Sequence, residues 1–497
     1  MSQQTWQAIS MVIYLVAMVY IGFVANRKTE DLDDYMLGGR RLTPFVSALS
    51  AGAADMSGWL LMGLPGAIYV SGLVEGWIAI GLTVGAWLNW KFVAPRLRTY
   101  TEVASNSITI PSYLGARLRD SSNVLRLVAG AIILVFFTFY VSSGMVSGGT
   151  FFETSFGMNY GLGMTIVAAV TVLYTLVGGF LAVSWTDVVQ GVMMVTALVI
   201  LPIVGVIHVG GPAELAGAIT AVDPQLLNWV SGGTAVGIVS ALAWGLGYFG
   251  QPHILVRFMA LTSAGEAKAA RRIGIGWMVL SCLGAGMTAL VGIAVYQHDE
   301  GRLANPEGVF IALGQLLFHP LLAGFMLAAI LAAIMSTVSS QLLVTSSALV
   351  EDLYRAFSKR ELSPRGGVWL GRFGVLIVSI VAALLAWQRN DTILGLVAFA
   401  WAGFGAGFGP TIVLSLYWRR LTAAGATAGM IAGAITVVVW KQLSGGIFDL
   451  YEILPGFLVN LVVAVVISLA TPKPGQEIDD EFDRAVELAD AEVPGTR

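Results

Sequence analysis

The sequence contains little charge and a single cysteine. Only 11% of its 497 residues are Asp, Glu, Lys or Arg, whereas 57% are hydrophobic, and this balance excludes an ordinary soluble globular protein. Cys282 stands alone, which excludes an intramolecular disulfide. No basic residue precedes the first apolar stretch, which begins near Ile9, and no convincing cleavage site follows it. We therefore expect this stretch to be a retained membrane span and not a signal peptide.

Motifs for catalysis and metal chelation are also missing from the sequence. The spacing of the four histidines is not that of a metal site: His208, His253, His298 and His319. The sequence contains no phosphate-binding glycine loop, nucleophile elbow or zinc motif. It therefore predicts no catalytic residues and no enzyme, and it gives no sign of a nucleic-acid ligand or of an obligate protein partner.

Long apolar runs make up most of the sequence instead. A transmembrane helix needs about 20 predominantly apolar residues. Thirteen candidate spans are centred near residues 17, 57, 84, 138, 171, 197, 245, 283, 335, 379, 405, 433 and 461. We therefore predict an all-α polytopic protein of about 13 transmembrane helices, with nearly the whole chain in the lipid bilayer.

The basic residues of the chain occur in clusters between the predicted spans. With thirteen spans and an external N-terminus, every cluster falls on the cytoplasmic side, and only Arg302, Arg389 and Lys441 fall outside. This asymmetry agrees with the positive-inside rule and predicts a cytoplasmic C-terminus. No Lys or Arg occurs from Leu127 to Val256, so an anionic ligand bound there must be held by backbone amides or hydroxyls.

Glycine and proline interrupt two of the predicted spans. The interruptions lie near residue 57, at Gly52, Gly58, Gly63, Pro65 and Gly66, and near residue 245, at Gly245, Gly247, Gly250 and Pro252. The two spans are five apart and therefore run in opposite directions, which predicts two inverted repeats, spans 2 to 6 and 7 to 11, with a binding site at the interrupted helices. The alternative is that the glycines only allow close helix packing.

This pattern divides the chain into five parts. We expect residues 1–44 to contain the first transmembrane helix and a cytoplasmic connector. Residues 45–208 form the first inverted repeat and residues 209–420 the second. Two C-terminal transmembrane helices occupy residues 421–471. The acidic tail, residues 472–497, is expected to be cytoplasmic and solvated or weakly helical.

Asp55 places a carboxylate in the middle of the first interrupted span. An ionisable residue inside a membrane span indicates a functional site. A helix break there frees backbone carbonyls, which suit a small hard cation. We expect the carbonyls of Ala53 and Met56 to be ligands, with Asp55 supplying negative charge. Alternatively, Asp55 caps the second half of the broken helix.

Small and hydroxyl residues form one stripe of the span near residue 335. Helical spacing brings Ala333, Ser336, Thr337 and Ser340 onto the same face. Two adjacent hydroxyls and a carbonyl one turn back provide hard oxygen atoms, and opposite a broken helix they predict a sodium site. The alternative is that these hydroxyls only bond the carbonyl four residues back.

The second half of the first broken span offers a site for a carboxylate. The amides of Ser57 and Gly58 begin a half-helix whose positive end favours an anion. Tyr140, Trp244 and Tyr248 can pack on a compact apolar ring and attract its ammonium group through their π faces. The alternative is that these aromatic residues only fill the helix bundle.

Asp187 is a second carboxylate among the apolar spans. It is expected at the cytoplasmic boundary, between the fifth and sixth spans. Either it attracts a cation that leaves the site or it caps a helix, and the cap is the simpler interpretation.

These motifs resemble the sodium/solute symporter family, and within it the bacterial proline carriers. The matching segments are residues 37–40, 47–67, 179–187, 244–255, 330–343 and 399–410. The resemblance implies a LeuT-like fold of five plus five helices with discontinuous spans 2 and 7, one helix before the repeats and two after. It implies a sodium site at Ala53, Asp55, Met56, Ala333, Ser336 and Thr337. It further implies a proline site at Ser57, Gly58, Tyr140, Trp244, Tyr248 and Pro252, and a role in coupling or ion release for Arg40 and Asp187.

Together these features predict a secondary active transporter of the bacterial inner membrane. It is expected to couple sodium entry to L-proline uptake by alternating access, with the sodium ion as the implied cofactor. One alternative is a proton-coupled carrier in which Asp55 carries the proton. Others are a family member specific for a sugar, a vitamin or another amino acid, and, from a different class, an ion channel.

Overall fold

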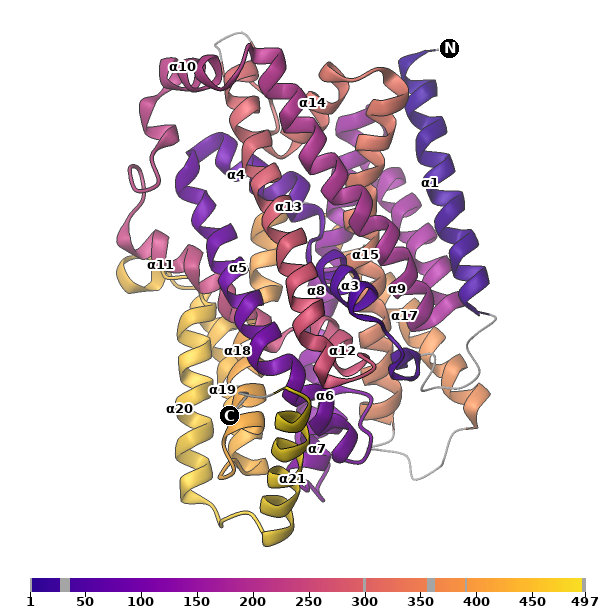
Figure 1. The fold of residues 1–497 in the computed structure, drawn as a ribbon, viewed down its shortest axis with the longest axis vertical. Coiled ribbons are helices and arrows are strands. Elements are labelled where there is room, and N and C mark those ends of the chain that lie inside the picture. The colour runs from indigo at the N-terminus through magenta and orange to yellow at the C-terminus, as the bar shows by residue number, and fades with distance from the viewer. Residues whose placement is uncertain (1, 27–35, 298–300, 355–362, 389–390, 494–497) are drawn as a thin grey trace.

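The computed structural model describes residues 2–26, 36–297, 301–354, 363–388 and 391–493. In this part of the chain the secondary structure is helical, apart from one isolated bridge between Leu42 and Leu261. Helix α1 (Gln3–Asn26) lies at one edge of the bundle, and α19 (Ala423–Trp440) and α20 (Ile453–Ala470) lie at the opposite edge (Figure 1). The central helices lie between these two edges.

The first repeat region contains α3 to α9. Its main helices are α3 (Pro44–Asp55), α4 (Leu64–Ser71), α5 (Trp77–Leu88), α6 (Ala94–Val103), α7 (Ile110–Arg117), α8 (Val124–Phe156) and α9 (Tyr160–Val209). The second region contains α10 (Pro212–Val222), α11 (Ala235–Ala243), α12 (Pro252–Met259), α13 (Ala267–Tyr296), α14 (Val309–Leu317), α15 (Pro320–Ser347), α17 (Pro364–Ala386) and α18 (Ile393–Tyr417).

All thirteen predicted spans fall on apolar helices. In the described residues, ten helices are long and apolar enough to cross a membrane, and a bent pair, Pro44–Asp55 with Trp59–Ser71, makes an eleventh. The spans predicted near residues 171 and 245 fall on the shorter apolar helices Tyr160–Leu176 and Ala235–Gly250. The all-helical membrane architecture predicted from the sequence is therefore confirmed.

The first predicted break is a bend of 62° between Pro44–Asp55 and Trp59–Ser71. The second lies in the span predicted near residue 245, where α11 gives way to a 3₁₀ turn, η6 (Trp244–Gly250), before α12 begins. Close packing contributes at both breaks. A Cβ atom on Gly52 would lie 2.9 Å from the Trp277 ring, and one on Gly250 would lie 2.2 Å from the Phe404 carbonyl oxygen. The glycines therefore serve packing as well as the breaks.

The acidic tail forms helix α21 (Gln476–Glu492), at the end of the molecule away from the N-terminus (Figure 1). Phe482 is only 5% exposed, and its ring centroid lies 6.1 Å from that of Tyr100. Arg119 forms ion pairs with Glu477 and Glu481, at 3.4 and 3.2 Å. The expectation of a solvated tail is therefore wrong for one face of this helix, because apolar residues at helical spacing bury it.

We expect Phe482→Ala to release α21 from the bundle. Removal of a buried phenylalanine side chain costs about 3 kcal/mol or more, which raises the undocked population about 100-fold. Limited trypsin digestion at Arg484 should then accelerate by a similar factor, because proteolysis follows the open population. Leu488→Ala is the matched control, since Leu488 lies on the same helix and is 44% exposed. Equal cleavage of both variants would show that Phe482 does not hold the helix.

Candidate functional site

The break after α3 is built from three residues. Met56 has left the helical conformation, with φ −81° and ψ 75°. The Ser57 amide donates to the Asp55 carbonyl at 3.0 Å, and the Ser57 hydroxyl accepts from the Trp59 amide at 3.4 Å. The Ser57 amide predicted to bind a solute carboxylate is therefore already bonded within the break.

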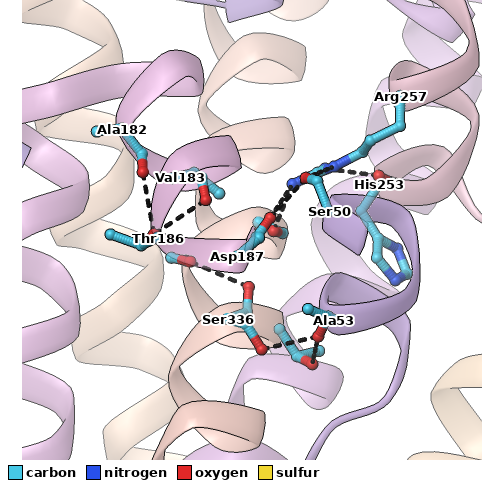
Figure 2. Close-up of polar contacts among 12 residues, drawn as sticks. Ser50, Ala53, Ala182, Val183, Thr186, Asp187, His253, Arg257 and Ser336 are labelled. Carbon is cyan, nitrogen blue, oxygen red and sulfur yellow. Dashed lines mark hydrogen bonds and ion pairs between the residues drawn. The ribbon is translucent and has the colours of Figure 1, made fainter. Parts of the chain in front are cut away.

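Four of the six residues predicted for the sodium site converge between α3 and α15. The Ala53 carbonyl accepts from the Ser336 hydroxyl at 2.7 Å and from the Thr337 hydroxyl at 3.4 Å (Figure 2). The same hydroxyls donate to the Ala333 carbonyl at 3.0 and 3.2 Å, as the bonding alternative also predicts. Met56 is buried at the break, but no hydrogen bond among the described residues joins its carbonyl to this face.

This oxygen face suits a small hard cation. Each of the two hydroxyl oxygens lies within hydrogen-bond distance of both carbonyl oxygens, and all four residues are at most 1% exposed. If the hydroxyl protons rotate away, all four oxygen atoms can turn lone pairs toward one cation. Such an oxygen set matches the ligands that hard cations prefer.

We expect Ser336→Ala and Thr337→Val each to raise the sodium concentration for half-maximal transport. Loss of one oxygen ligand should shift it about 10-fold, the equivalent of about 1.4 kcal/mol. The measurement is the sodium activation curve of solute uptake in proteoliposomes. Ser347→Ala and Thr345→Val are matched controls, because in the described part of the chain these hydroxyls bond within α15, to Leu343 and Gln341. If sodium binds elsewhere, the sodium activation curves of all four variants should be alike.

Asp55 joins the two broken helices. Its side chain is buried, and one carboxylate oxygen accepts a hydrogen bond from the Tyr248 hydroxyl in η6. The other carboxylate oxygen has no hydrogen-bond partner among the described residues. The alternative interpretation, that Asp55 caps the second half-helix, is wrong, because the carboxylate is turned to Tyr248 and makes no cap bond.

The predicted aromatic residues divide into two groups. Trp244 stacks on Tyr451 with ring centroids 5.2 Å apart and lies 6.4 Å from Trp59. Tyr248 meets the Trp401 ring edge-on at 5.1 Å. Trp244 and Tyr248 thus contact other aromatic residues, Trp59, Trp401 and Tyr451, which were not singled out from the sequence, and their role in solute binding stays a prediction.

The other group surrounds the start of α12. Tyr140 in α8 meets the His253 ring edge-on, with centroids 5.9 Å apart. Pro252 is the first residue of α12 and lines a small cavity together with Thr109, Val344 and other residues. Gly58 lies against α8, where an added Cβ would come within 2.9 Å of the Ser147 hydroxyl oxygen. Tyr140 and Pro252 thus meet at the second break, whereas Gly58 packs on α8 at the first.

Asp187 lies in a buried network that the sequence did not reveal. It sits about two turns inside the helix Gly179–Val209, so its interpretation as a helix cap is wrong. Asp187 accepts from the Ser50 hydroxyl at 2.7 Å and from the Arg257 guanidinium at 3.2 Å (Figure 2). Arg257 also donates to the Ser340 hydroxyl at 2.6 Å, so the last residue of the predicted stripe belongs to this network.

Arg257 is the functional candidate that sequence reasoning missed. It belongs to one of the basic clusters that the sequence assigns to the cytoplasmic side, yet it is fully buried. The available signal was its apolar setting in α12, PHILVRFM, where a charged residue needs a buried partner.

Arg40 fixes the chain that enters α3. It ends the short turn η1 (Gly38–Arg40) in a left-handed conformation with φ 55°. Its guanidinium donates to the Met259 carbonyl and the Ser107 carbonyl, each at 2.8 Å, and to the Thr101 hydroxyl at 3.1 Å. Arg40 thus ties η1 to the ends of α6 and α12, while its predicted role in coupling stays a prediction.

Three kinds of comparison identify relatives of the chain. The family model described as sodium:solute symporter family matches residues 35–433. The high-affinity proline transporter PutP of Bacillus subtilis is 58% identical over 467 residues, 94% of this chain and 98% of that protein. The sodium/proline symporter of Escherichia coli is 50% identical over 490 residues, 98% of this chain and 97% of that one.

Solved structures with the same fold are also transporters. A Na⁺-coupled sialic acid symporter in a substrate-bound outward-open state aligns with a TM-score of 0.80 at 21% identity, covering 95% of this chain and 99% of that one. Mhp1, a nucleobase-cation-symport-1 family transporter in a closed conformation, aligns with a TM-score of 0.57 at 15% identity, covering 92% and 98%. These matches confirm the predicted LeuT-like inverted-repeat fold.

Proposed function

The chain belongs to the sodium:solute symporter family, and on that premise we propose that it couples sodium entry to L-proline uptake. The observation that carries the proposal is the oxygen face of Ala53, Ser336 and Thr337 beside a broken helix. Freed carbonyls inside a membrane need a polar partner, and a sodium ion satisfies them. The similarity to proline carriers over nearly the whole chain supports proline as the solute.

The geometry supports a mechanism in which sodium prepares the solute site. A sodium ion between α3 and α15 would replace the hydrogen bonds that now join Ala53 to Ser336 and Thr337. The ion would thereby hold the break in one conformation, with Asp55 supplying charge. Because Asp55 also bonds Tyr248 in the second broken helix, sodium binding orders both helices, which gives positive coupling between the two ligands.

We further propose the orientation and the division of the chain. Residues 45–208 and 209–420 form the inverted repeats, the N-terminus is external and the C-terminus is cytoplasmic, in the bacterial inner membrane. The tail helix supports this orientation, because it contacts Arg119 and Arg419, which belong to clusters that the positive-inside rule assigns to the cytoplasm. Figure 1 shows this helix and the start of α1 at opposite ends of the bundle.

Purified protein in proteoliposomes tests the proposed function. Radiolabelled L-proline should accumulate under an inward sodium gradient and should not accumulate in sodium-free buffer under a pH gradient. Uptake that is undiminished without sodium would establish the proton-coupled alternative, and counterflow competed by a sugar or another amino acid would reassign the solute. Conductance without solute would indicate a channel, and conversion of the solute would indicate an enzyme.

A further inference from the structure

Buried polar groups without partners collect at the start of α12. His253 is the second residue of this helix and is 0% exposed, and in the described part of the chain neither of its ring nitrogens has a hydrogen-bond partner. The Tyr140 hydroxyl and the Gln251 side-chain oxygen are buried and unpaired in the same way. Leaving such groups unpaired destabilises the fold. A polar ligand that paired with these groups would remove this cost.

Two of these groups, Tyr140 and His253, are held next to each other. The Tyr140 and His253 rings stand perpendicular at 5.9 Å, and Phe137 covers the imidazole edge-on at 5.4 Å. Gln251 is the residue that precedes α12, and its amide nitrogen donates to the Trp401 carbonyl at 3.1 Å. The imidazole and the hydroxyl thus present donors from two helices, α12 and α8.

The charge at this point favours an anion. The first amides of a helix carry partial positive charge, and His253 lies in the first turn of α12. Arg257, one turn further on, donates to the His253 carbonyl at 2.6 Å, while its own charge is paired with Asp187. A neutral imidazole N–H and a phenol O–H both donate to a carboxylate oxygen.

The other predicted place for a carboxylate is less open. The Ser57 amide is already bonded to the Asp55 carbonyl at 3.0 Å. The backbone at Gly58 lies so close to α8 that a Cβ there would meet the Ser147 hydroxyl oxygen at 2.9 Å. The start of the second broken helix thus has unbonded donors, whereas at the first broken helix the Ser57 amide is already used.

We infer that His253 binds the solute, donating its imidazole N–H to the solute carboxylate at the start of α12, beside Pro252 and together with the Tyr140 hydroxyl. The inference rests on the proposed function, because it requires an amino acid as solute. It assigns the carboxylate to the second broken helix and leaves the sodium face between α3 and α15 unchanged.

His253→Phe tests the inference by removing both nitrogens while it keeps a planar ring. Unlabelled L-proline and L-proline methyl ester each compete with radiolabelled proline for uptake. The inhibition constant of the ester divided by that of proline reports how strongly the carboxylate is recognised. We expect the variant to bind proline about 10- to 100-fold more weakly, as for a lost hydrogen bond to a charged group, and to bind the ester almost unchanged. At a saturating proline concentration, the sodium activation curve should keep its midpoint, because coupling to the solute is then fully expressed in both proteins.

Equal weakening of proline and ester, or no change in either, would overturn the assignment to His253. His208→Phe, at an exposed histidine, is the control and should leave the ratio unchanged. If His253→Phe does not fold, His253→Asn and His253→Gln replace it, since their amides reach different ring-nitrogen positions. The ratio should fall in one of these variants and persist in the other. A ratio equal to that of the parent protein in both variants would also overturn the assignment. Failure of the parent protein to take up proline with sodium would instead refute the proposed function.

Discussion

Asp55→Asn will raise the sodium concentration for half-maximal uptake at least about 100-fold, because it removes the negative charge beside the proposed ion in a low-dielectric site. The substitution keeps the shape of the side chain and an oxygen that can accept the hydrogen bond from Tyr248. The loss therefore reports charge and not packing. The measurement is proline uptake in proteoliposomes over a wide range of sodium concentration.

Two companion variants sharpen this result. Asp55→Glu keeps the charge and should retain most of the sodium affinity, whereas Tyr248→Phe removes only the hydrogen bond to the carboxylate. We expect Tyr248→Phe to shift the sodium curve about 10-fold or less, as for one hydrogen bond to a charged group. A sodium curve for Asp55→Asn that matches the parent curve would rule out an electrostatic role for Asp55.

Arg257→Gln will destabilise the protein by about 3–5 kcal/mol, because it leaves the Asp187 carboxylate buried without its counterion. Both side chains are 0% exposed and lie 3.2 Å apart. The detergent-solubilised variant should therefore unfold several degrees lower in temperature than the parent, as followed by size-exclusion chromatography after heating. Uptake should fall with the loss of folded protein.

The double variant Arg257→Gln with Asp187→Asn tests whether the loss of stability comes from the unpaired carboxylate. With both charges removed, no carboxylate is left unpaired, and much of the lost thermal stability should return. Arg119→Gln is the matched control, because its ion pairs with the tail are exposed, and pairs of this kind contribute little. Additive losses in the double variant would show that Arg257 and Asp187 do not act as a pair.

Local features of the sequence predicted one half of the site well. The break beside Asp55 follows from glycines and a carboxylate in a single apolar span, and the Ser336 and Thr337 stripe follows from helical spacing. Both signals are contained within about one helix. We predicted that the break and the stripe face each other because a cation needs oxygen ligands from both. In the structure, Ser336 and Thr337 of the stripe donate hydrogen bonds to the Ala53 carbonyl beside the break.

The other half depends on contacts that no local pattern encodes. Tyr248 and Asp55 are 193 residues apart, and Arg257 and Asp187 are 70 apart. Basic residues near a loop are usually solvated, so the composition assigned Arg257 to a cytoplasmic cluster. Its burial depends on how α12 packs against α3, which is a property of the tertiary fold.

The bond between Asp55 and Tyr248 determines which parts of the transporter can move as rigid units. It fastens a helix of the first repeat region to a helix of the second, so the two regions cannot rock against each other as separate bodies without breaking it. While it persists, both broken helices travel together. Ser336 and Thr337 lie across from this pair on α15, so a motion that separated α3 from α15 would part the oxygen atoms proposed to hold the cation, and release of the ion would accompany that motion.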